Sequence, residues 1–341
     1  MATLVVFAAL AIAVAALLPK ASRGAGALPA LNVAPNEVSV SGLSSGGFMA
    51  VQMHVAHAAI MRGAGIVAGG PYGCAEGSPA QALGPCMTGN PDGAAAAHLV
   101  GRLARHQRID DPAHLAVQRV WLFSGRQDPV VVPSVMAQLE RFYRQFVPSG
   151  QITFRNTLPA GHGFPVLAGD GRCEAPGAGY LAPCGFDGAG ELLQHIHGPL
   201  QTPEAGPPPG QLLAFDQRQY LPEEGGARSH GLADIGHVFV PATCARGARC
   251  RIHVAFHGCR QNVDTAGDAF IAHAGYNRWA AANGIVVLYP QTRATWGLPF
   301  NPNGCWDWWG YTGADYATRD APQIRAVRRM IDRLAAGHPG G

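Results

Sequence analysis

The serine in Gly42-Leu43-Ser44-Ser45-Gly46 is the residue of this chain best placed to act as a nucleophile. A short strand is predicted before it, at residues 38–40, and a helix after it, at residues 48–61. A Gly-x-Ser-x-Gly sequence between a strand and a helix forms a sharp elbow that exposes the serine hydroxyl and aims the next amide at a developing oxyanion. A glycine-rich turn without chemistry is the alternative. Ser45 is the second candidate nucleophile, although it lacks a glycine two residues before it.

A nucleophilic serine needs a general base, and the base needs a carboxylate to orient it. Where such an elbow occurs, these residues follow in the order serine, acid, histidine. Asp128 comes soon after the apolar segment 119–123, at a strand end where ligands gather in open α/β sheets. His162 lies between two glycines in a later loop. We predict Ser44, Asp128 and His162 as the triad. A surface-turn role for Asp128 is the alternative, and no clear strand precedes the weaker acids Asp170 and Asp187.

The two amides that would bind the oxyanion are predicted to be those of Ser45 and Cys259. The second donor normally comes from a His-Gly motif at a strand end that precedes the nucleophile. Here His257-Gly258-Cys259 instead lies far downstream, at the end of the apolar segment 252–256. A circular permutation explains this order, because it moves the first strands of the sheet to the C-terminal half.

Predicted strands and helices alternate along the chain. Strands are predicted at 38–40, 119–123, 151–156, 252–256 and 285–289, and helices at 48–61, 133–146, 190–197 and 268–282. This alternation is typical of a mostly parallel sheet with helices on both faces. The Pro-rich segment 203–210 then becomes a surface loop within one α/β-hydrolase domain, residues 28–341, and not a domain boundary.

Composition points to a secreted globular protein. The chain has 341 residues, of which 48% are hydrophobic and 14% charged. Its formal net charge of +3, without a basic run, argues against nucleic-acid binding. The apolar segment 1–18, followed by Ala25-Gly26-Ala27, predicts a signal peptide at residues 1–27. An N-terminal membrane anchor is the alternative.

The eight cysteines are expected to form disulfides after export. No Cys-x-x-Cys pair suggests a zinc site. Eight cysteines allow about 105 connectivities, and proximity in sequence favours one of them. It pairs Cys74 with Cys86, Cys173 with Cys184, Cys244 with Cys250, and Cys259 with Cys305.

Three tryptophans fall within the segment 303–311. At least one is expected to line an apolar cleft, while the others anchor the loop. Trp306 is the first choice for an exposed substrate-binding face, and Trp308 is the second because it points the same way in an extended segment. Trp309 would then be the core anchor.

At these residues the chain resembles the poly(3-hydroxybutyrate) depolymerases, in particular their secreted, single-domain, circularly permuted type. The resemblance extends from Leu28 to about Leu334. Its most specific parts are Ser41–Ala50, Ala68–Tyr72, His257–Cys259 and Asn301–Trp308.

The resemblance implies a serine esterase that cleaves poly(3-hydroxybutyrate) or its oligomers through an acyl-enzyme, without cofactor or metal. It implies the triad, oxyanion amides and cysteine pairs given above, and a substrate-binding role for Trp306 or Trp308. We expect a monomer that binds neither nucleic acid nor, after signal removal, a membrane. Arg126, Gln127 and a shortened Trp296 loop depart from the family pattern, which affects the expected substrate size. A feruloyl or acetyl carbohydrate esterase and a non-catalytic polymer-binding protein are the alternatives.

Overall fold

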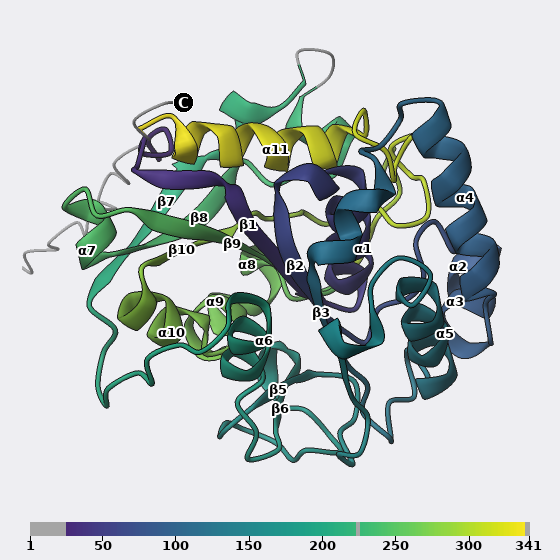
Figure 1. Ribbon diagram of the computed structural model, residues 1–341, viewed down its shortest axis with the longest axis horizontal. Helices are drawn as coiled ribbons and strands as arrows, with labels where there is room; N and C mark the ends of the chain where they lie inside the picture. The colour runs from purple at the N-terminus through teal and green to yellow at the C-terminus, as the bar shows by residue number, and fades with distance from the viewer. Residues whose placement is uncertain (1–24, 223–225, 338–341) are drawn as a thin grey trace, which may run out of the picture.

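The central sheet takes strands from both halves of the chain. In the computed structural model, which describes residues 25–222 and 226–337, its order is β4-β3-β2-β1-β9-β10-β8-β7 (Figure 1). The strands are β1 (Val33–Leu43), β2 (Met61–Val67), β3 (Arg119–Phe123), β4 (Ile152–Arg155), β7 (Gly210–Asp216), β8 (Ile235–Pro241), β9 (Cys250–Phe256) and β10 (Ile285–Tyr289). All neighbours are parallel except β10–β8 and β8–β7. The predicted mostly parallel α/β sheet is confirmed.

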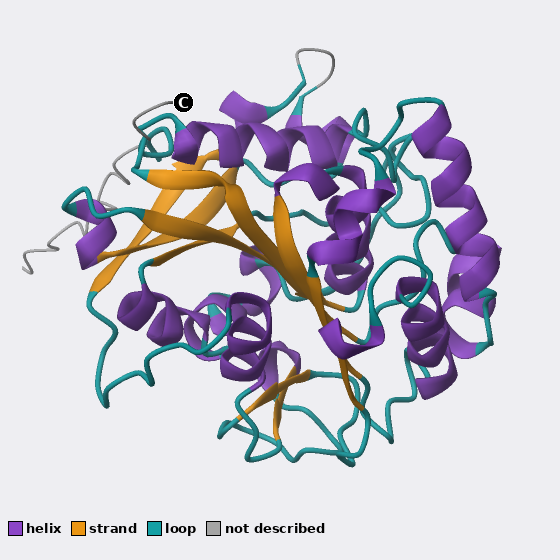
Figure 2. Cartoon of the chain, viewed as in Figure 1, coloured by secondary structure: helices purple, strands orange, loops and turns teal. Residues whose placement is uncertain are grey.

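Helices cover both faces of this sheet (Figure 2). One layer contains α1 (Ser45–Ala56), α5 (Pro133–Tyr143) and α11 (Pro322–Ala335), with α4 (Gly93–Arg105) packed on α5; the other contains α6 (Gly188–His197), α9 (Ala269–His273) and α10 (Tyr276–Asn283). The remaining helices are short: α2 (Pro79–Leu83), α3 (Pro85–Thr88), α7 (Ala242–Ala245) and α8 (Val263–Ala266). Each helix layer packs on one face of the sheet and forms its own hydrophobic core, and successive strand residues point alternately into one core and the other. In β3, for example, Val120 and Leu122 face the first layer, while Trp121 and Phe123 face the second.

The two ends of the described chain lie against each other, as a permuted fold requires. The Leu31 amide donates to the Leu334 carbonyl at 2.8 Å, and Arg333 Nε donates to the Leu28 carbonyl at 2.8 Å. Figure 1 shows the end of α11 beside the start of β1. Joining these ends and opening the chain before β7 would place β9, which carries His257-Gly258-Cys259, ahead of β1, which carries Ser44.

The structure differs from the prediction in two helices, the one that follows Ser44 and the one expected at 268–282. The helix expected at 48–61 ends at Ala56, and the chain then enters β2, which contains two glycines and was not predicted. A Cβ on Gly63 would lie 2.0 Å from the Arg119 carbonyl oxygen, so glycine allows β2 and β3 to pair closely. The helix expected at 268–282 breaks into α9 and α10 because Gly275 has φ +97°.

A small second sheet follows the candidate histidine. Its two parallel strands are β5 (Phe164–Val166) and β6 (Leu181–Pro183). The Cys173–Cys184 disulfide closes the loop between them. His162 therefore stands at the base of a cross-linked loop.

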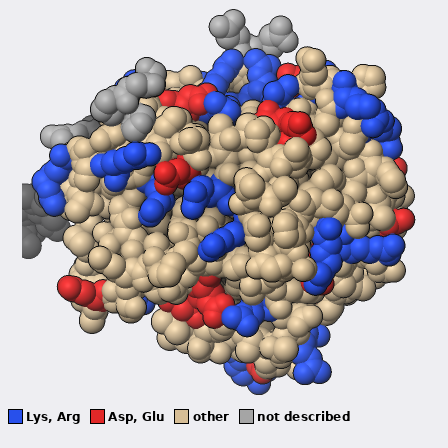
Figure 3. Space-filling view, in the orientation of Figure 1, with Lys and Arg blue, Asp and Glu red and all other residues tan. Residues whose placement is uncertain are grey.

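The predicted signal peptide lies almost wholly outside the described residues, which begin at 25. Within the described ranges, no helix is both long and apolar enough to cross a membrane. Most of the face shown in Figure 3 is uncharged, and acidic and basic groups are interspersed over it.

Several histidines are buried in the neutral form. Burial lowers the pKa of His54, His57 and His257 from 6.5 to about 4. At His54, Nε2 donates to Gln118 Oε1 at 2.6 Å, and Nδ1 accepts from the Tyr143 hydroxyl at 3.0 Å. Both ring nitrogens are therefore satisfied without a second proton.

The free energy of unfolding should fall as the pH is lowered from 6.5 to about 4. In that range the unfolded chain binds protons that the folded histidines exclude, so acid favours unfolding. Since one pKa unit corresponds to about 1.4 kcal/mol, His54 alone contributes about 3 kcal/mol above pH 6.5. Urea unfolding at pH 7.5 and at pH 4.5 measures the loss. His54→Gln, which does not titrate, should show a weaker pH dependence, and an equal dependence in both proteins would contradict this assignment.

Candidate active site

Ser44 occupies the elbow between β1 and α1. Its backbone has φ 58° and ψ −124°, a region that non-glycine residues rarely adopt and that marks functional strain. The flanking residues must be glycine because there is no room for a side chain at either position. A Cβ on Gly42 would lie 2.2 Å from the Gly46 carbonyl oxygen, and one on Gly46 would lie 2.3 Å from that of His257. Ser44 is partly exposed although its neighbours are buried. The elbow thus presents this hydroxyl at the sheet edge.

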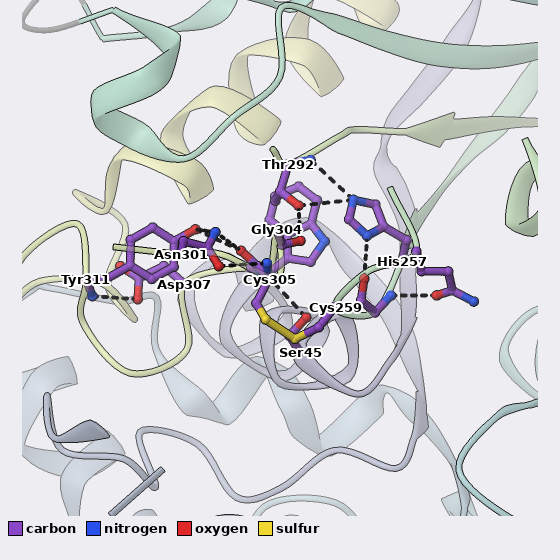
Figure 4. Close-up of a disulfide and its surroundings, with 12 residues drawn as sticks. Ser45, His257, Cys259, Thr292, Asn301, Gly304, Cys305, Asp307 and Tyr311 are labelled. Carbon is purple, nitrogen blue, oxygen red and sulfur yellow. Dashed lines mark hydrogen bonds between the residues drawn. A yellow bond between two sulfur atoms is a disulfide. The ribbon is translucent and has the colours of Figure 1, made fainter. Parts of the chain in front are cut away.

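Ser45 does not present its hydroxyl in this way. Its side chain is buried, and its Oγ accepts a hydrogen bond from the Trp306 amide at 3.3 Å (Figure 4). The hydroxyl of Ser45 therefore has a structural partner, while its backbone amide lies at the start of α1. This geometry favours Ser44 over Ser45 as the nucleophile.

Asp128 and His162 are joined as the sequence predicts. His162 Nδ1 lies 2.9 Å from Asp128 Oδ2 and 3.1 Å from Oδ1. Asp128 is buried, and its Oδ1 also accepts from the amides of Val130 at 2.8 Å and Val131 at 3.0 Å. These two amides fix the carboxylate, which in turn can orient the imidazole. No hydrogen bond joins His162 to the Ser44 hydroxyl in the part of the chain described.

The loop of His162 is held from both sides. The Gly161 amide donates to the Cys173 carbonyl at 2.9 Å, and the Gln127 amide donates to the Ala160 carbonyl at 3.1 Å. The first bond ties the loop to the Cys173–Cys184 disulfide, and the second ties it to the Asp128 loop. The histidine side chain is 11% exposed, and Nδ1 is the ring nitrogen that faces Asp128.

The amides of Ser45 and Cys259 are both available as oxyanion donors. Among the hydrogen bonds of residues 25–222 and 226–337, none uses either amide. A Cβ on Gly258 would lie 3.4 Å from Ser44 Cβ, which places the end of β9 directly beside the elbow. Hydrogen-bond donors preorganised at such a position stabilise a tetrahedral intermediate.

The four predicted disulfides are confirmed. They join Cys74 to Cys86, Cys173 to Cys184, Cys244 to Cys250, and Cys259 to Cys305, and none of the eight cysteines is free. The Cα atoms of Cys259 and Cys305 are 4.2 Å apart. This bridge fastens the tryptophan segment, residues 303–311, to the His257-Gly258-Cys259 segment after β9 (Figure 4).

The prediction of an exposed face on Trp306 is wrong. Its side chain is 0% exposed and packs edge-on against Phe256, while Trp308 is 5% exposed and stacks on Phe48 at 4.1 Å. Trp309, the expected core anchor, is the most accessible of the three tryptophans.

The physical reason is a turn anchored by the buried carboxylate of Asp307. It accepts from the amides of Gly310 at 2.7 Å, Tyr311 at 2.9 Å and Thr312 at 2.8 Å. The segment therefore curls around this carboxylate and does not run as the extended strand that the prediction assumed.

The Trp296 loop, which the sequence marks only as shortened, carries the most exposed apolar side chains near the Cys259–Cys305 bridge. Trp296 is 79% exposed, Leu298 97% and Phe300 58%. The backbones of Thr295 and Asn301 close this loop through two hydrogen bonds of 2.9 and 3.0 Å. Trp296, Leu298 and Phe300 alternate with Gly297 and Pro299, and large apolar residues spaced through a turn-rich segment are the signal that could have identified this loop.

No group of three or more histidine, cysteine or acidic side chains in the described ranges is arranged to hold a metal ion. The side chains and amides described above are of the types that acyl transfer by general-base and oxyanion catalysis uses.

Comparison with known proteins yields two related sequences. The chain is 41% identical over 320 residues to the poly(3-hydroxybutyrate) depolymerase of Delftia acidovorans. The aligned region covers 92% of this chain and 62% of the Delftia enzyme. It is 37% identical over 334 residues to the polyhydroxybutyrate depolymerase of Talaromyces funiculosus, covering 94% of this chain and 96% of that enzyme. The chain thus spans less than two thirds of the first relative and nearly all of the second. No family model matches the chain.

Solved structures are also similar to this one, among them two of PHB depolymerase. One is the crystal structure of PHB depolymerase from Penicillium funiculosum, and the other is a serine-to-alanine variant of PHB depolymerase complexed with R3HB trimer. Each has a TM-score of 0.84 and 35% sequence identity, covering 92% of this chain and 100% of the matched chain.

Proposed function

The chain belongs to the poly(3-hydroxybutyrate) depolymerase family, and we propose that it hydrolyses poly(3-hydroxybutyrate) or its oligomers. The observation that carries the proposal is a serine on a strained elbow at the same sheet edge as a buried His–Asp pair. The R3HB trimer bound to a related depolymerase supports an oligomeric 3-hydroxybutyrate substrate.

In the proposed reaction Ser44 Oγ attacks the ester carbonyl and forms an acyl-enzyme. His162 Nε2 takes the serine proton and returns it to the leaving alcohol, while Asp128 holds the Nδ1–H tautomer. The amides of Ser45 and Cys259 bind the oxyanion. Water then repeats the sequence and releases the acid product.

We further propose that residues 1–27 are a signal peptide and that residues 28–341 form one secreted catalytic domain. The four disulfides support an oxidising compartment. The shared sheet and the contact between Leu31 and Leu334 support a single domain.

Product analysis on amorphous poly(3-hydroxybutyrate) film tests the substrate class. Purified protein should release 3-hydroxybutyrate or its short oligomers and should act poorly on feruloyl or acetylated sugar esters. Faster cleavage of a feruloyl ester, with intact film, would assign the site to the carbohydrate esterases.

The Trp296 loop is the proposed contact with solid polymer, in place of Trp306 and Trp308. Asn301 connects this loop to the active-site edge, because its Nδ2 donates to the Cys305 carbonyl and its Oδ1 accepts the Cys305 amide, both at 2.9 Å. Exposed aromatic and aliphatic groups gain free energy by covering apolar polymer units away from the scissile bond.

Trp296→Ala is expected to lower adsorption and the rate on polymer film about tenfold, which corresponds to about 1.4 kcal/mol of lost apolar contact. The rate on a soluble butyrate ester should be unchanged, because a short ester has no remote units to bury. Val117→Ala is the matched control, since Val117 is 82% exposed but lies before β3 at the opposite edge of the sheet. Equal losses on both substrates, or equal losses in both variants, would remove the loop from polymer binding.

A further inference from the structure

We infer that His257 is a positioning residue that locks the Gly258–Cys259 peptide in the orientation that presents the Cys259 amide to the oxyanion. The inference rests on the proposed function, because it concerns a donor of the proposed oxyanion hole. His257 does not itself touch the reacting atoms in this arrangement. It acts through the peptide that follows it.

The geometry of one peptide unit carries the argument. The Gly258 carbonyl accepts a hydrogen bond from His257 Nδ1 at 2.7 Å. The Gly258–Cys259 bond is trans, because the cis bond in the described ranges is Leu298–Pro299. In a trans peptide the carbonyl and the N–H point in opposite directions. Fixing the Gly258 carbonyl on the imidazole therefore turns the Cys259 N–H away from His257.

The proton on Nδ1 is fixed by the other side of the ring. The Thr292 amide donates to His257 Nε2 at 3.2 Å, so Nε2 must carry a lone pair (Figure 4). The Thr292 hydroxyl donates to the Gly304 carbonyl at 2.6 Å. Burial lowers the pKa of His257 to about 4, so the ring is neutral near pH 7 and its single proton is on Nδ1.

The neighbouring amides are all occupied. The Gly258 amide donates to Gln261 Oε1 at 2.6 Å, the Arg260 amide to the Asn303 carbonyl at 2.7 Å, and the Gln261 amide to the Gly258 carbonyl at 3.3 Å. Between residues 258 and 261 the Cys259 amide is the donor left over. The Gly258 carbonyl thus has two donors, of which the imidazole is the nearer.

The Gln261 side chain connects the Gly258 backbone to a second part of the site. Gln261 Nε2 donates to the Gly179 carbonyl, which lies between Cys173 and Cys184. The buried amide side chain of Gln261 thereby connects the segment after β9 to the β5–β6 loop, to which the loop of His162 is bonded through the Gly161 amide and the Cys173 carbonyl. Reorienting the Gly258 peptide would disturb both.

A pair of substitutions separates positioning from packing. Asn carries its amide nitrogen on Cγ, as His carries Nδ1, so His257→Asn keeps a donor for the Gly258 carbonyl. Gln places its oxygen near the position of Nε2, so His257→Gln keeps an acceptor for the Thr292 amide and loses the donor. Each variant retains one of the two hydrogen bonds, so their melting temperatures should be similar.

Kinetics on a soluble butyrate ester should distinguish the two variants. His257→Gln should lower kcat about 30-fold with little change in KM, less than the 10²–10³ typical when an oxyanion donor is removed outright. His257→Asn should stay within about fivefold of the wild-type kcat. Affinity for a trifluoromethyl ketone, which forms a tetrahedral oxyanion adduct with Ser44, should fall in parallel with kcat.

The outcomes separate this inference from the proposed function. If the wild type hydrolyses the ester through Ser44 but both variants lose kcat equally, or neither loses it, His257 has no positioning role. If the wild type shows no Ser44-dependent hydrolysis, the proposed function fails, and the inference fails with it.

A measurement on the unaltered protein remains decisive even if a variant does not fold. Nitrogen-15 NMR of histidine-labelled protein should show a ring N–H on Nδ1 of His257, assigned through its contacts with the Trp306 ring, whose centroid lies 5.6 Å away. A proton on Nε2 would overturn the inference.

Discussion

Ser44→Ala is expected to lower the rate of ester hydrolysis by about 10⁵–10⁶-fold, because it removes the hydroxyl that we propose forms the acyl-enzyme. The fold should survive, since alanine and serine meet the same strain at φ 58° and the Ser44 hydroxyl makes no hydrogen bond in the described structure. Initial rates on a soluble butyrate ester measure the loss, and an unchanged melting temperature confirms folding.

Ser45→Ala is the matched control for this experiment. The Ser45 hydroxyl accepts from the Trp306 amide, so its removal should reduce stability modestly, while the backbone amide of residue 45 stays in place for its proposed role as an oxyanion donor. An organophosphate should label Ser44 in the wild type and in Ser45→Ala. Retained activity in Ser44→Ala together with loss in Ser45→Ala would reverse the assignment.

Much of the site edge could be predicted because its strands are buried on both faces. Segments such as 119–123 and 285–289 are continuous apolar runs, and the structure reproduces them as β3 and β10 with the same bounds. Since parallel strands end at one edge, residues that follow them were expected to meet there. The contact between Asp128 and His162 follows this rule.

Two of the missed strands, β2 and β7, lack that signal for physical reasons, whereas β8 was missed although Val238, Phe239 and Val240 form a buried apolar run. In β2, Gly63 allows the backbone of β3 to approach closely. A strand that contains glycines has fewer apolar side chains, so no apolar run marks it in the sequence. The edge strand β7 is largely exposed, so no buried run marks it. Glycine also interrupts one predicted helix, at Gly275, where the positive φ depends on the tertiary fold and not on local periodicity.

The tryptophan segment shows why a loop residue's burial is hard to predict. The sequence shows three tryptophans close together, but it does not show that the Asp307 carboxylate folds their segment into a turn. That turn exists because Asp307 is also fixed through its own backbone, whose amide donates to Gln323 Oε1 at 2.9 Å and whose carbonyl accepts from Gln52. These partners are distant in sequence, so local spacing carries no information about them.

Asp128→Asn is the second large effect expected, a loss of about 10⁴-fold in kcat near neutral pH, the size typical when a triad aspartate becomes asparagine. The amides of Val130 and Val131 both donate to Oδ1, so the asparagine oxygen will occupy that position. Its NH₂ then replaces Oδ2 and faces His162 Nδ1, 2.9 Å away in the wild type. A donor there favours the tautomer with the proton on Nε2, which cannot accept the proton of Ser44.

Asp187→Asn provides the matched control for that change. Asp187 Oδ1 accepts from the Gly190 amide at 2.9 Å and Oδ2 accepts from Trp279 Nε1 at 2.9 Å, so the same substitution again sets a donor against a donor. Asp187→Asn should therefore lower the melting temperature and leave kcat nearly unchanged. Asp128→Asn should show the opposite pattern, with the cost appearing in kcat. A loss of kcat as small in Asp128→Asn as in Asp187→Asn would mean that the carboxylate only anchors its loop, and that His162 is oriented by some other group.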